Sequence, residues 1–444
     1  MPKTFSIGGV HPPENKLTAD KKIEILPIPQ TVSVPVSQHI GTPAKVVVNL
    51  KDKVKTGQLI AESGGFISAN IHSPVSGTVS KIENVLDSSG YKRLSVIIQV
   101  EGDEWLESID RSQDLKSEIT LSEDAIVDKI KESGIVGLGG ATFPSHVKLV
   151  PPKGMIPEIL ILNGVECEPY LTSDHRLMME KGAEIIIGTK ILMKALRIEK
   201  AAIGIENNKP DAISHLSKLL ENQKNISVVA LKVQYPQGGE KQLIDAVIKR
   251  QVPSGKLPIS VGAVVHNVGT AFAVYEAVQK NKPLIDRVVT ITGKTVKKPS
   301  NFLVRIGTST SELIEAAGGL PEDTGKIISG GPMMGKSLNS IDVPITKGTS
   351  GILILPQDES SRRPVMACIR CSKCVSVCPM GLEPFLLMTL SEKNFAERLE
   401  TEKTLDCIEC GSCSYVCPAD RPLLDYIRLG KGRVTKMQKA RNAN

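Results

Sequence analysis

The sequence has few aromatic residues and no long run of basic or apolar residues. Aromatics make up 3% of the 444 residues, and the net charge of +7 is spread along the chain. A nucleic-acid-binding face needs clustered basic residues, so this composition argues against that class of protein. The longest apolar stretches, such as PEILILNGV, are far shorter than the roughly 20 residues that span a bilayer. Any attachment to a membrane must therefore go through a protein partner or a charged surface.

The first residues, MPKTFSIGGVHPPENK, lack the charged-then-apolar-then-small order of a secretory signal peptide. We therefore expect the chain to stay inside the cell. Of the nine cysteines, eight fall in two short runs and only Cys167 stands apart. In a reducing compartment this clustering indicates metal ligands and not disulfides.

The two runs are CIRCSKCVSVCP at residues 368–379 and CIECGSCSYVCP at residues 407–418. Both follow C-x2-C-x2-C-x3-C-P, the spacing of bacterial ferredoxins, in which the fourth cysteine of each run ligates the other [4Fe–4S] cluster. The alternative, a zinc site, usually joins two C-x2-C pairs from separate segments. The spacing therefore predicts one cluster held by Cys368, Cys371, Cys374 and Cys417, and a second held by Cys407, Cys410, Cys413 and Cys378.

The hydrophobic pattern divides the chain before these runs into modules. Residues 1–108 contain an N-terminal arm and short strands between Gly and Pro turns, which predicts an all-β domain. Two of its stretches, LKDKVKTGQLIAE and IHSPVSGTVSKIE, resemble the barrel-sandwich domains of biotinyl and lipoyl carriers. The hairpin SGGFISAN lacks the lysine that carriers modify, so we expect no swinging-arm role. Residues 109–282 repeat strand, turn and helix, which predicts a Rossmann-like parallel α/β domain. Ligands bind such sheets beyond the carboxyl ends of the strands.

Two smaller domains and a tail follow. Residues 283–356 return to short strands with one helix and predict a β-grasp, SLBB-like domain. A polar linker at 356–364 opens a helical double-cluster ferredoxin-like domain, residues 357–430. We expect the basic tail, residues 431–444, to be frayed and solvated. The predicted fold class is thus multidomain, combining α/β and β domains.

Four segments of the middle domain resemble, in order, the flavin and NADH site of the large nucleotide-binding subunit of respiratory complex I. They are GLGGATFP with the lysine that follows, NGVECEP with DHR, YPQGGEKQL and NVGT, between residues 137 and 270. With the lead-in FSIGGVHPPENK, the segment PVSQHIGTPA, the β-grasp pattern and the double cysteine run, the resemblance covers nearly the whole chain. It is to the RnfC family, whose members belong to the Rnf complex, a membrane-bound ferredoxin:NAD+ oxidoreductase that couples electron transfer to ion pumping.

The resemblance implies which residues contact the cofactors. FMN would be surrounded by Gly137, Gly139, Gly140, Lys148, Asn163, Asn267 and Thr270. The flavin and nicotinamide would be contacted by Phe143, Glu166, Glu168, Gly238, Gly239 and Glu240. Two positions depart from the complex I pattern, because Leu138 replaces an arginine and Gly239 replaces the first glutamate of GEE. Both departures concern nucleotide affinity more than fold.

The same resemblance implies a flavoprotein that lies peripherally on the cytoplasmic side of the cell membrane. It would exchange hydride with NAD(H) at FMN and pass single electrons through two [4Fe–4S] clusters to other subunits of an Rnf-type complex, reaching ferredoxin only through a partner. A flavin is the expected converter, since nicotinamide exchanges two electrons together whereas a cluster carries one. The alternatives are a soluble cobalamin reductase-like protein and an electron-relay scaffold without a working nucleotide site.

Other residues near the predicted site have simpler interpretations. We expect Cys167 to pack at a strand end and not to react. His146, His175 and His266 lack metal-ligand spacing, so we expect them to form polar walls or surface. Tyr235 either stacks on a ring or covers a strand end.

Overall fold

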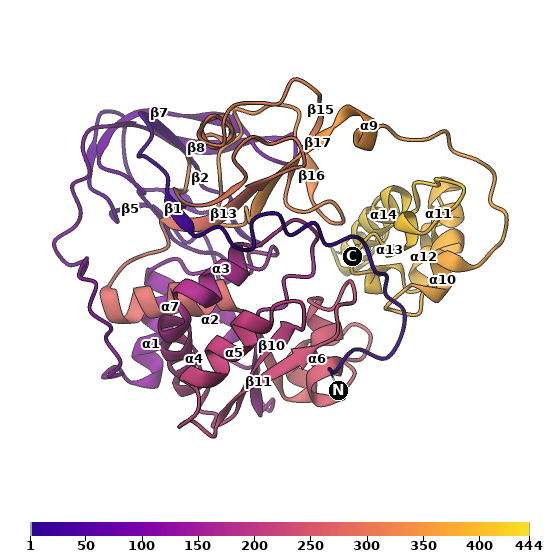
Figure 1. Cartoon of the computed structure of the whole chain (residues 1–444), viewed down its shortest axis with the longest axis horizontal. Coiled ribbons are helices and arrows are strands. Elements are labelled where there is room, and N and C mark those ends of the chain that lie inside the picture. Colours follow the sequence, from indigo (N-terminus) through magenta and orange to yellow (C-terminus); the bar gives the residue numbers. More distant parts are fainter. Residues whose placement is uncertain (1, 444) are drawn as a thin grey trace.

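The computed structural model describes residues 2–443 of the chain. In the view of Figure 1 the two β-rich domains lie at the top, the helix-covered sheet lies below them, and the cysteine domain lies to one side. None of the helices in the described part combines the length and the apolar character that a membrane span requires.

The N-terminal β domain consists of two sheets that share one core. One sheet has the order β2-β8-β7-β4 and the other β3-β5-β6. Its strands are β2 Thr31–Pro35, β3 Lys45–Val46, β4 Lys53–Val54, β5 Leu59–Glu62, β6 Ile71–His72, β7 Gly77–Leu86 and β8 Lys92–Val100. Alternate residues point inward, so Val32 and Val34 of one sheet meet Ile60 and Ile71 of the other. The predicted all-β module is confirmed.

The middle domain is built on a four-stranded sheet in which every pairing is parallel. Its order is β11-β10-β9-β12, with β9 Ile159–Asn163, β10 Ala201–Glu206, β11 Ile226–Leu231 and β12 Ala263–Asn267. The strand order reverses between β9 and β12, which creates the switch point where ligands bind such sheets. The Rossmann-like prediction is therefore confirmed.

Helices cover both faces of this sheet. They are α1 Glu123–Glu132, α2 Ser145–Lys148, α3 Ser173–Glu180, α4 Gly182–Leu196, α5 Pro210–Leu219, α6 Glu240–Ile248, the 3-10 turn η1 Pro258–Val261 and α7 Val268–Lys280. Two begin with residues that favour helix starts, since Ser122 caps α1 through its side chain and Pro210 opens α5. The pair α3 and α4, between β9 and β10, was not predicted from the sequence.

The β-grasp domain contains a six-stranded sheet of order β1-β14-β13-β17-β15-β16. Its elements are β13 Asp286–Thr292, β14 Ser300–Arg305, α8 Thr310–Ala316, β15 Thr324–Ser329, β16 Lys336–Ser337 and β17 Gly351–Pro356. The edge strand β1, Ile23–Ile25, comes from the N-terminal arm and runs parallel to β14. The N-terminal arm therefore contributes a strand to the β-grasp domain as well as leading into the N-terminal domain.

The cysteine domain is helical, as predicted. It contains α9 Gln357–Ser360, α10 Lys373–Ser376, α11 Pro384–Glu392, α12 Ala396–Thr401, η2 Thr404–Asp406, α13 Ser412–Tyr415 and α14 Leu423–Ala443. The expectation of a frayed tail was wrong, because α14 continues through residue 443. Val434 is fully buried, and Arg441 pairs with Glu400 of α12 at 2.7 Å. Packing against α12 thus orders a segment whose composition alone indicates a solvated tail.

Candidate functional site

The glycine loop, residues 137–143, lies beside the carboxyl end of β12. A Cβ added to Gly139 would come within 3.4 Å of the Asn267 side chain. Gly140 has a φ of +110°, and a Cβ added there would meet nothing within 4 Å. The loop thus presents bare backbone to open space at the switch point, an arrangement that fits a phosphate or a flat ring system.

The glycine loop is closed and anchored by hydrogen bonds. The Gly137 N–H donates to the Phe143 carbonyl oxygen at 2.9 Å, and the Leu138 N–H donates to Thr270 Oγ1 at 2.9 Å. The Leu138 side chain is buried in the core of the domain. Arg287 of β13 approaches the Leu138 carbonyl oxygen with Nη2 at 3.5 Å. A guanidinium group therefore does lie next to this loop. It comes from the β-grasp domain, so a comparison of motifs within the middle domain could not find it.

Two asparagines at strand ends join the loops around the switch point. Asn163 Nδ2 donates to the Gly238 carbonyl oxygen at 2.8 Å. Asn267 Nδ2 donates to Asp174 Oδ2 at 2.6 Å and to the Asn163 carbonyl oxygen at 3.3 Å. The Asn267 Oδ1 caps α7 by accepting from the Gly269 N–H at 2.8 Å. Loops that are distant in the sequence are thereby fixed at one edge of the sheet.

Lys148 and Glu240 form an ion pair at this edge. Lys148 Nζ lies 2.7 Å from Glu240 Oε1 and 3.0 Å from the Val265 carbonyl oxygen. Both side chains are partly exposed, so the lysine can exchange the carboxylate for a phosphate. Burial and the Lys148 charge lower the pKa of the neighbouring His266 to about 3. His266 is therefore a neutral wall of the site, in agreement with its interpretation from the sequence.

Gly239 directly precedes α6. A Cβ there would come 2.5 Å from Gln242 Oε1, the end of a side chain that could move, and 3.2 Å from the Pro236 carbonyl oxygen.

The carboxylates of Glu166 and Glu168 are already engaged with protein groups. Glu166 accepts hydrogen bonds from two backbone N–H groups in the first turn of α3, at 2.8 and 3.1 Å, and so caps that helix. Glu168 accepts from the backbone N–H groups of Met333 and Met334 at 3.1 and 2.8 Å. Burial raises the pKa of Glu168 to about 7. These two side chains join the loop after β9 to its surroundings, whereas Gly139, Lys148 and Gly238 contact residues near the carboxyl ends of β9 and β12.

The thiols of the two cysteine runs interleave. Burial raises the pKa of Cys407 to about 11 and of Cys413 to about 12, and in both cases the nearby thiol of Cys378 adds to the increase. Burial also raises the pKa of Cys374, and here Cys417 is the neighbouring thiol. One cavity is lined by Cys378 together with Cys407, Cys410 and Cys413, and Cys417 is a neighbour of Cys374. Crossed ligation of two [4Fe–4S] clusters would need neighbours of this kind. Among the described residues, no three or more His, Cys, Asp or Glu side chains stand close enough to hold one metal ion.

The two groups of cysteines differ in exposure. Cys368 and Cys371 are exposed, whereas Cys410 and Cys413 are buried. The second run is covered because it packs on the rest of the chain. There the Tyr235 hydroxyl donates to the Cys410 carbonyl oxygen at 2.7 Å.

Tyr235 and Cys167 lie in the apolar cluster that joins the second cysteine run to the middle domain. Tyr235 is almost completely buried in this cluster, which favours the covering role over stacking on a ring. Cys167 packs there as expected, and burial raises the pKa of its thiol.

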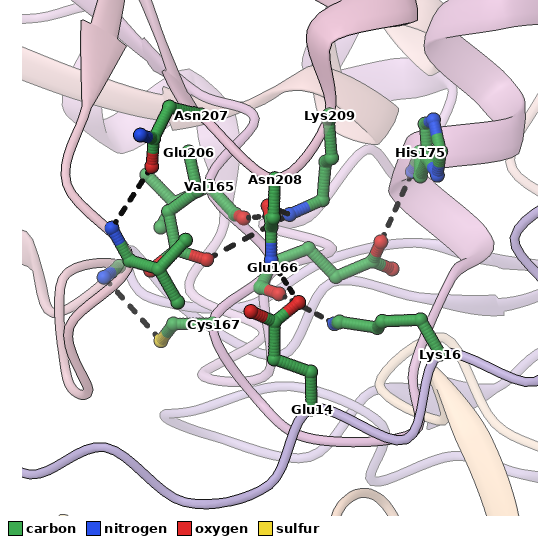
Figure 2. Close-up of polar contacts among 12 residues, drawn as sticks. Glu14, Lys16, Val165, Glu166, Cys167, His175, Glu206, Asn207, Asn208 and Lys209 are labelled. Atoms are coloured by element: carbon green, nitrogen blue, oxygen red, sulfur yellow. Dashed lines mark hydrogen bonds and ion pairs between the residues drawn. The ribbon is translucent and has the colours of Figure 1, made fainter. Parts of the chain in front are cut away.

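A buried polar group behind the loop after β9 was not predicted from the sequence (Figure 2). Lys209 Nζ donates to the Val165 carbonyl oxygen at 2.8 Å and lies 3.7 Å from Glu206 Oε2. Lys16 of the N-terminal arm approaches the same loop from another side. The only signal for Lys16 was its place in the lead-in segment, which says nothing of its contacts.

Four protein families match successive parts of the chain. The RnfC barrel sandwich hybrid domain matches residues 4–103, and the Nuo51 FMN-binding domain matches residues 130–276. The SLBB domain matches residues 288–337, and the 4Fe-4S dicluster domain matches residues 360–418. Their order agrees with the four structural domains.

Relatives match almost the entire chain, and each is the component designated C of its complex. The one from the proton-translocating ferredoxin:NAD(+) oxidoreductase complex of Clostridium ljungdahlii is 50% identical, over 96% of this chain and 93% of the relative. The one from the Na(+)-translocating complex of Acetobacterium woodii is 43% identical, over 98% of each chain. The one from the ion-translocating oxidoreductase complex of Rhodobacter capsulatus is 41% identical, over 98% of this chain and 84% of the relative. An NAD+-reducing [NiFe]-hydrogenase structure overlaps 70% of this chain and 63% of its own, with a TM-score of 0.49 and 17% identity.

This extent of identity along the whole sequence, together with the matching order of the four domains, shows that the chain belongs to the RnfC family of ion-translocating ferredoxin:NAD+ oxidoreductase complexes.

Proposed function

We propose that this chain is the subunit at which NAD(H) exchanges electrons with an ion-translocating ferredoxin:NAD+ oxidoreductase complex. Bound FMN would convert between a hydride and single electrons, and two [4Fe–4S] clusters would carry the single electrons. The match to the Nuo51 FMN-binding and 4Fe-4S dicluster domains supports both cofactors. The high identity to components of ferredoxin:NAD(+) oxidoreductase complexes makes the cobalamin reductase alternative the weaker one.

The residues at the switch point have the chemistry to hold FMN. The bare backbone at Gly139 and Gly140 allows close approach of a phosphate or ring. The amides of Asn163 and Asn267 supply polar groups at the strand ends. Lys148 supplies a positive charge that would offset phosphate, after release from its pairing with Glu240.

One observation supports this function best, namely the contact between Tyr235 and Cys410. It joins the second cysteine run to the domain that carries the open switch-point edge. The group made of Cys378, Cys407, Cys410 and Cys413 is therefore the inner one. The group with the exposed Cys368 and Cys371 is the outer one, and we assign to it the exchange of electrons with the rest of the complex.

The surface at the outer group indicates the kind of partner. Between residues 361 and 376 the chain carries four basic residues and no acidic one. Val365, Met366 and Ile369 are exposed in the same segment. A basic rim around exposed apolar residues fits an acidic redox-carrying subunit, since opposite charges steer association. Such a partner would hold this chain peripherally on the cytoplasmic side of the membrane, where NAD(H) is found.

The test is to purify the full chain anaerobically, load it with iron, sulfide and FMN, and add NADH. We expect the flavin absorbance to bleach and reduced-cluster signals to appear in electron paramagnetic resonance spectra. Clusters that dithionite reduces but NADH does not would overturn the proposal and support an electron-relay scaffold.

A further inference from the structure

The first part of the chain, residues 2–22, forms an arm that runs along the other domains (Figure 1). The backbone of Lys3 bonds to the edge strand β11, and Ser6 donates to a carboxylate of α6. The Gly9 N–H donates to the Val377 carbonyl oxygen in the first cysteine run at 2.9 Å. The arm then reaches the β-grasp sheet as β1. It is therefore in contact with every domain that would carry or cover a redox centre.

The arm passes directly between the cysteine domain and the middle domain. Gly8 has a φ of +74°, and a Cβ there would come 2.7 Å from the backbone carbonyl of Cys378. Val10 exchanges two backbone hydrogen bonds with Tyr235, at 2.8 and 2.9 Å. Since Tyr235 also holds Cys410, the arm contributes to the contact between the inner cysteine group and the middle domain.

Further along the arm, Lys16 holds the loop that follows β9. Its Nζ donates to the carbonyl oxygens of Glu166, Glu168 and Leu171 at 2.8, 2.8 and 2.7 Å. An ammonium group has three donors, and here all three are used on one loop. The Tyr170 N–H of the same loop donates to the Glu14 carbonyl oxygen of the arm at 2.8 Å.

This loop, residues 164–171, needs such support because its backbone is unusual. Glu166 and Tyr170 have φ values of +47° and +70°, in the left-handed region that residues with a side chain seldom adopt. Lys209 supports the loop from another side through the Val165 carbonyl oxygen, so two ammonium groups lie behind it (Figure 2). Burial, followed by the charge of Lys209, lowers the pKa of Lys16 to about 8.

We propose that Lys16 is a positioning residue of the flavin site. Through Lys16 the N-terminal arm keeps loop 164–171 in a fixed position relative to the inner cysteine group. The loop starts directly after Asn163 at the switch point. Within it Cys167 packs in the cluster of Tyr235, and Glu168 accepts from the Met333 N–H of the β-grasp domain. A shift of the loop would therefore move Asn163, which lies at the switch-point edge, relative to the inner cysteines. The electron-transfer consequence depends on the proposed function, whereas the structural consequence does not.

The first test measures the loop itself. Lys16→Met keeps the length of the side chain and removes all three donors. Lys21→Met is the matched control, because the Lys21 side chain is exposed and pairs with the exposed Asp20 at 3.8 Å. Hydrogen–deuterium exchange of the full chain without NADH should be at least tenfold faster in residues 164–172 of Lys16→Met, with the control unchanged. The proposal would be overturned if the loop of Lys16→Met exchanged as slowly as that of the natural sequence, or if exchange were faster by the same factor in all domains.

The second test separates positioning from folding. In stopped-flow experiments with the chain loaded with FMN and clusters, Lys16→Met should slow cluster reduction at least tenfold more than it slows flavin reduction by NADH. Lys16→Gln keeps two N–H donors, so its effect should be intermediate, and it replaces Lys16→Met if that variant does not fold. Equal slowing of both steps would contradict the proposal. If the natural chain is not reduced by NADH, the proposed function fails, and the exchange measurement still decides the role of Lys16.

Discussion

The hydroxyl group of Tyr235 donates a hydrogen bond of 2.7 Å to the carbonyl oxygen of Cys410, and so joins the Rossmann-like domain to the second cysteine run. Tyr235 is almost completely buried, and burial raises the pKa of its hydroxyl, which therefore remains a proton donor. This contact makes one cysteine group the inner one and leaves the other exposed. The order of electron carriers in the proposed function depends on it.

We expect Tyr235→Phe to slow reduction of the clusters by NADH several-fold while the flavin is reduced at its usual rate. The substitution leaves the Cys410 carbonyl oxygen without its partner, which costs about 1–3 kcal/mol at the contact between the domains. Stopped-flow absorbance after mixing with NADH resolves the two phases. Tyr91→Phe, at an exposed tyrosine of the N-terminal domain, is the control. Unchanged cluster reduction in Tyr235→Phe would show that the contact does not serve electron transfer.

The crossed arrangement of the cysteines gives opposite predictions for two similar substitutions. Cys378→Ser should disturb the cluster of the second run, and Cys417→Ser the cluster of the first run. Each variant should lose up to about half of the iron, and electron paramagnetic resonance should show that a different cluster is retained. Cys167→Ser should keep the full iron content, because Cys167 is outside both predicted ligand sets. Loss of the same cluster in both variants would contradict the crossed assignment.

Lys148→Met should weaken FMN binding about tenfold to a hundredfold. A charge-assisted hydrogen bond to a phosphate contributes about 1.5–3 kcal/mol, which corresponds to this range. Fluorescence titration of the flavin-free chain with FMN measures the effect, and the iron content should not change. Lys153→Met, at an exposed lysine five residues further along the chain, should bind FMN as the natural sequence does. Equal affinities of the two variants would remove Lys148 from the flavin site.

The site could be predicted from the sequence where the chemistry depends on local spacing. The cysteine runs and the alternation of strand, turn and helix in the middle domain are of this kind. Residues that act across domains could not be found in this way, as Arg287 and Lys16 show. Arg287 reaches the glycine loop from β13, and Lys16 reaches the loop after β9 from the arm. The helical tail was missed because Val434 packs against neighbouring helices, a contact that composition does not reveal.

The pH dependence of stability should reflect buried neutral histidines. The pKa of His266 falls from 6.5 to about 3 because of burial and Lys148. Below pH 6.5 the unfolded chain binds a proton that the folded chain does not bind until about pH 3. The unfolding free energy should therefore decrease as the pH falls through this window, by up to about 1.4 kcal/mol per pH unit.

Replacing the histidine should remove this contribution. In denaturant titrations between about pH 6.5 and 4, His266→Gln should lose stability less steeply than the natural sequence as the pH falls. His72→Gln should flatten the slope in the same way, since burial also lowers the pKa of His72 to about 3, although His72 lies in the N-terminal domain. An unchanged slope in both variants would show that neither histidine is kept neutral by burial.

The central claim is that a flavin in this chain converts hydride from NADH into single electrons for the two cysteine groups. The most direct measurement compares NADH reduction of the clusters in the same full chain with FMN and after FMN has been removed. We predict rapid cluster reduction with FMN, none without it, and full recovery when FMN is added back. The account would be contradicted if the clusters were reduced equally fast without FMN. It would also be contradicted if NADH reduced the clusters in neither state although dithionite reduced them.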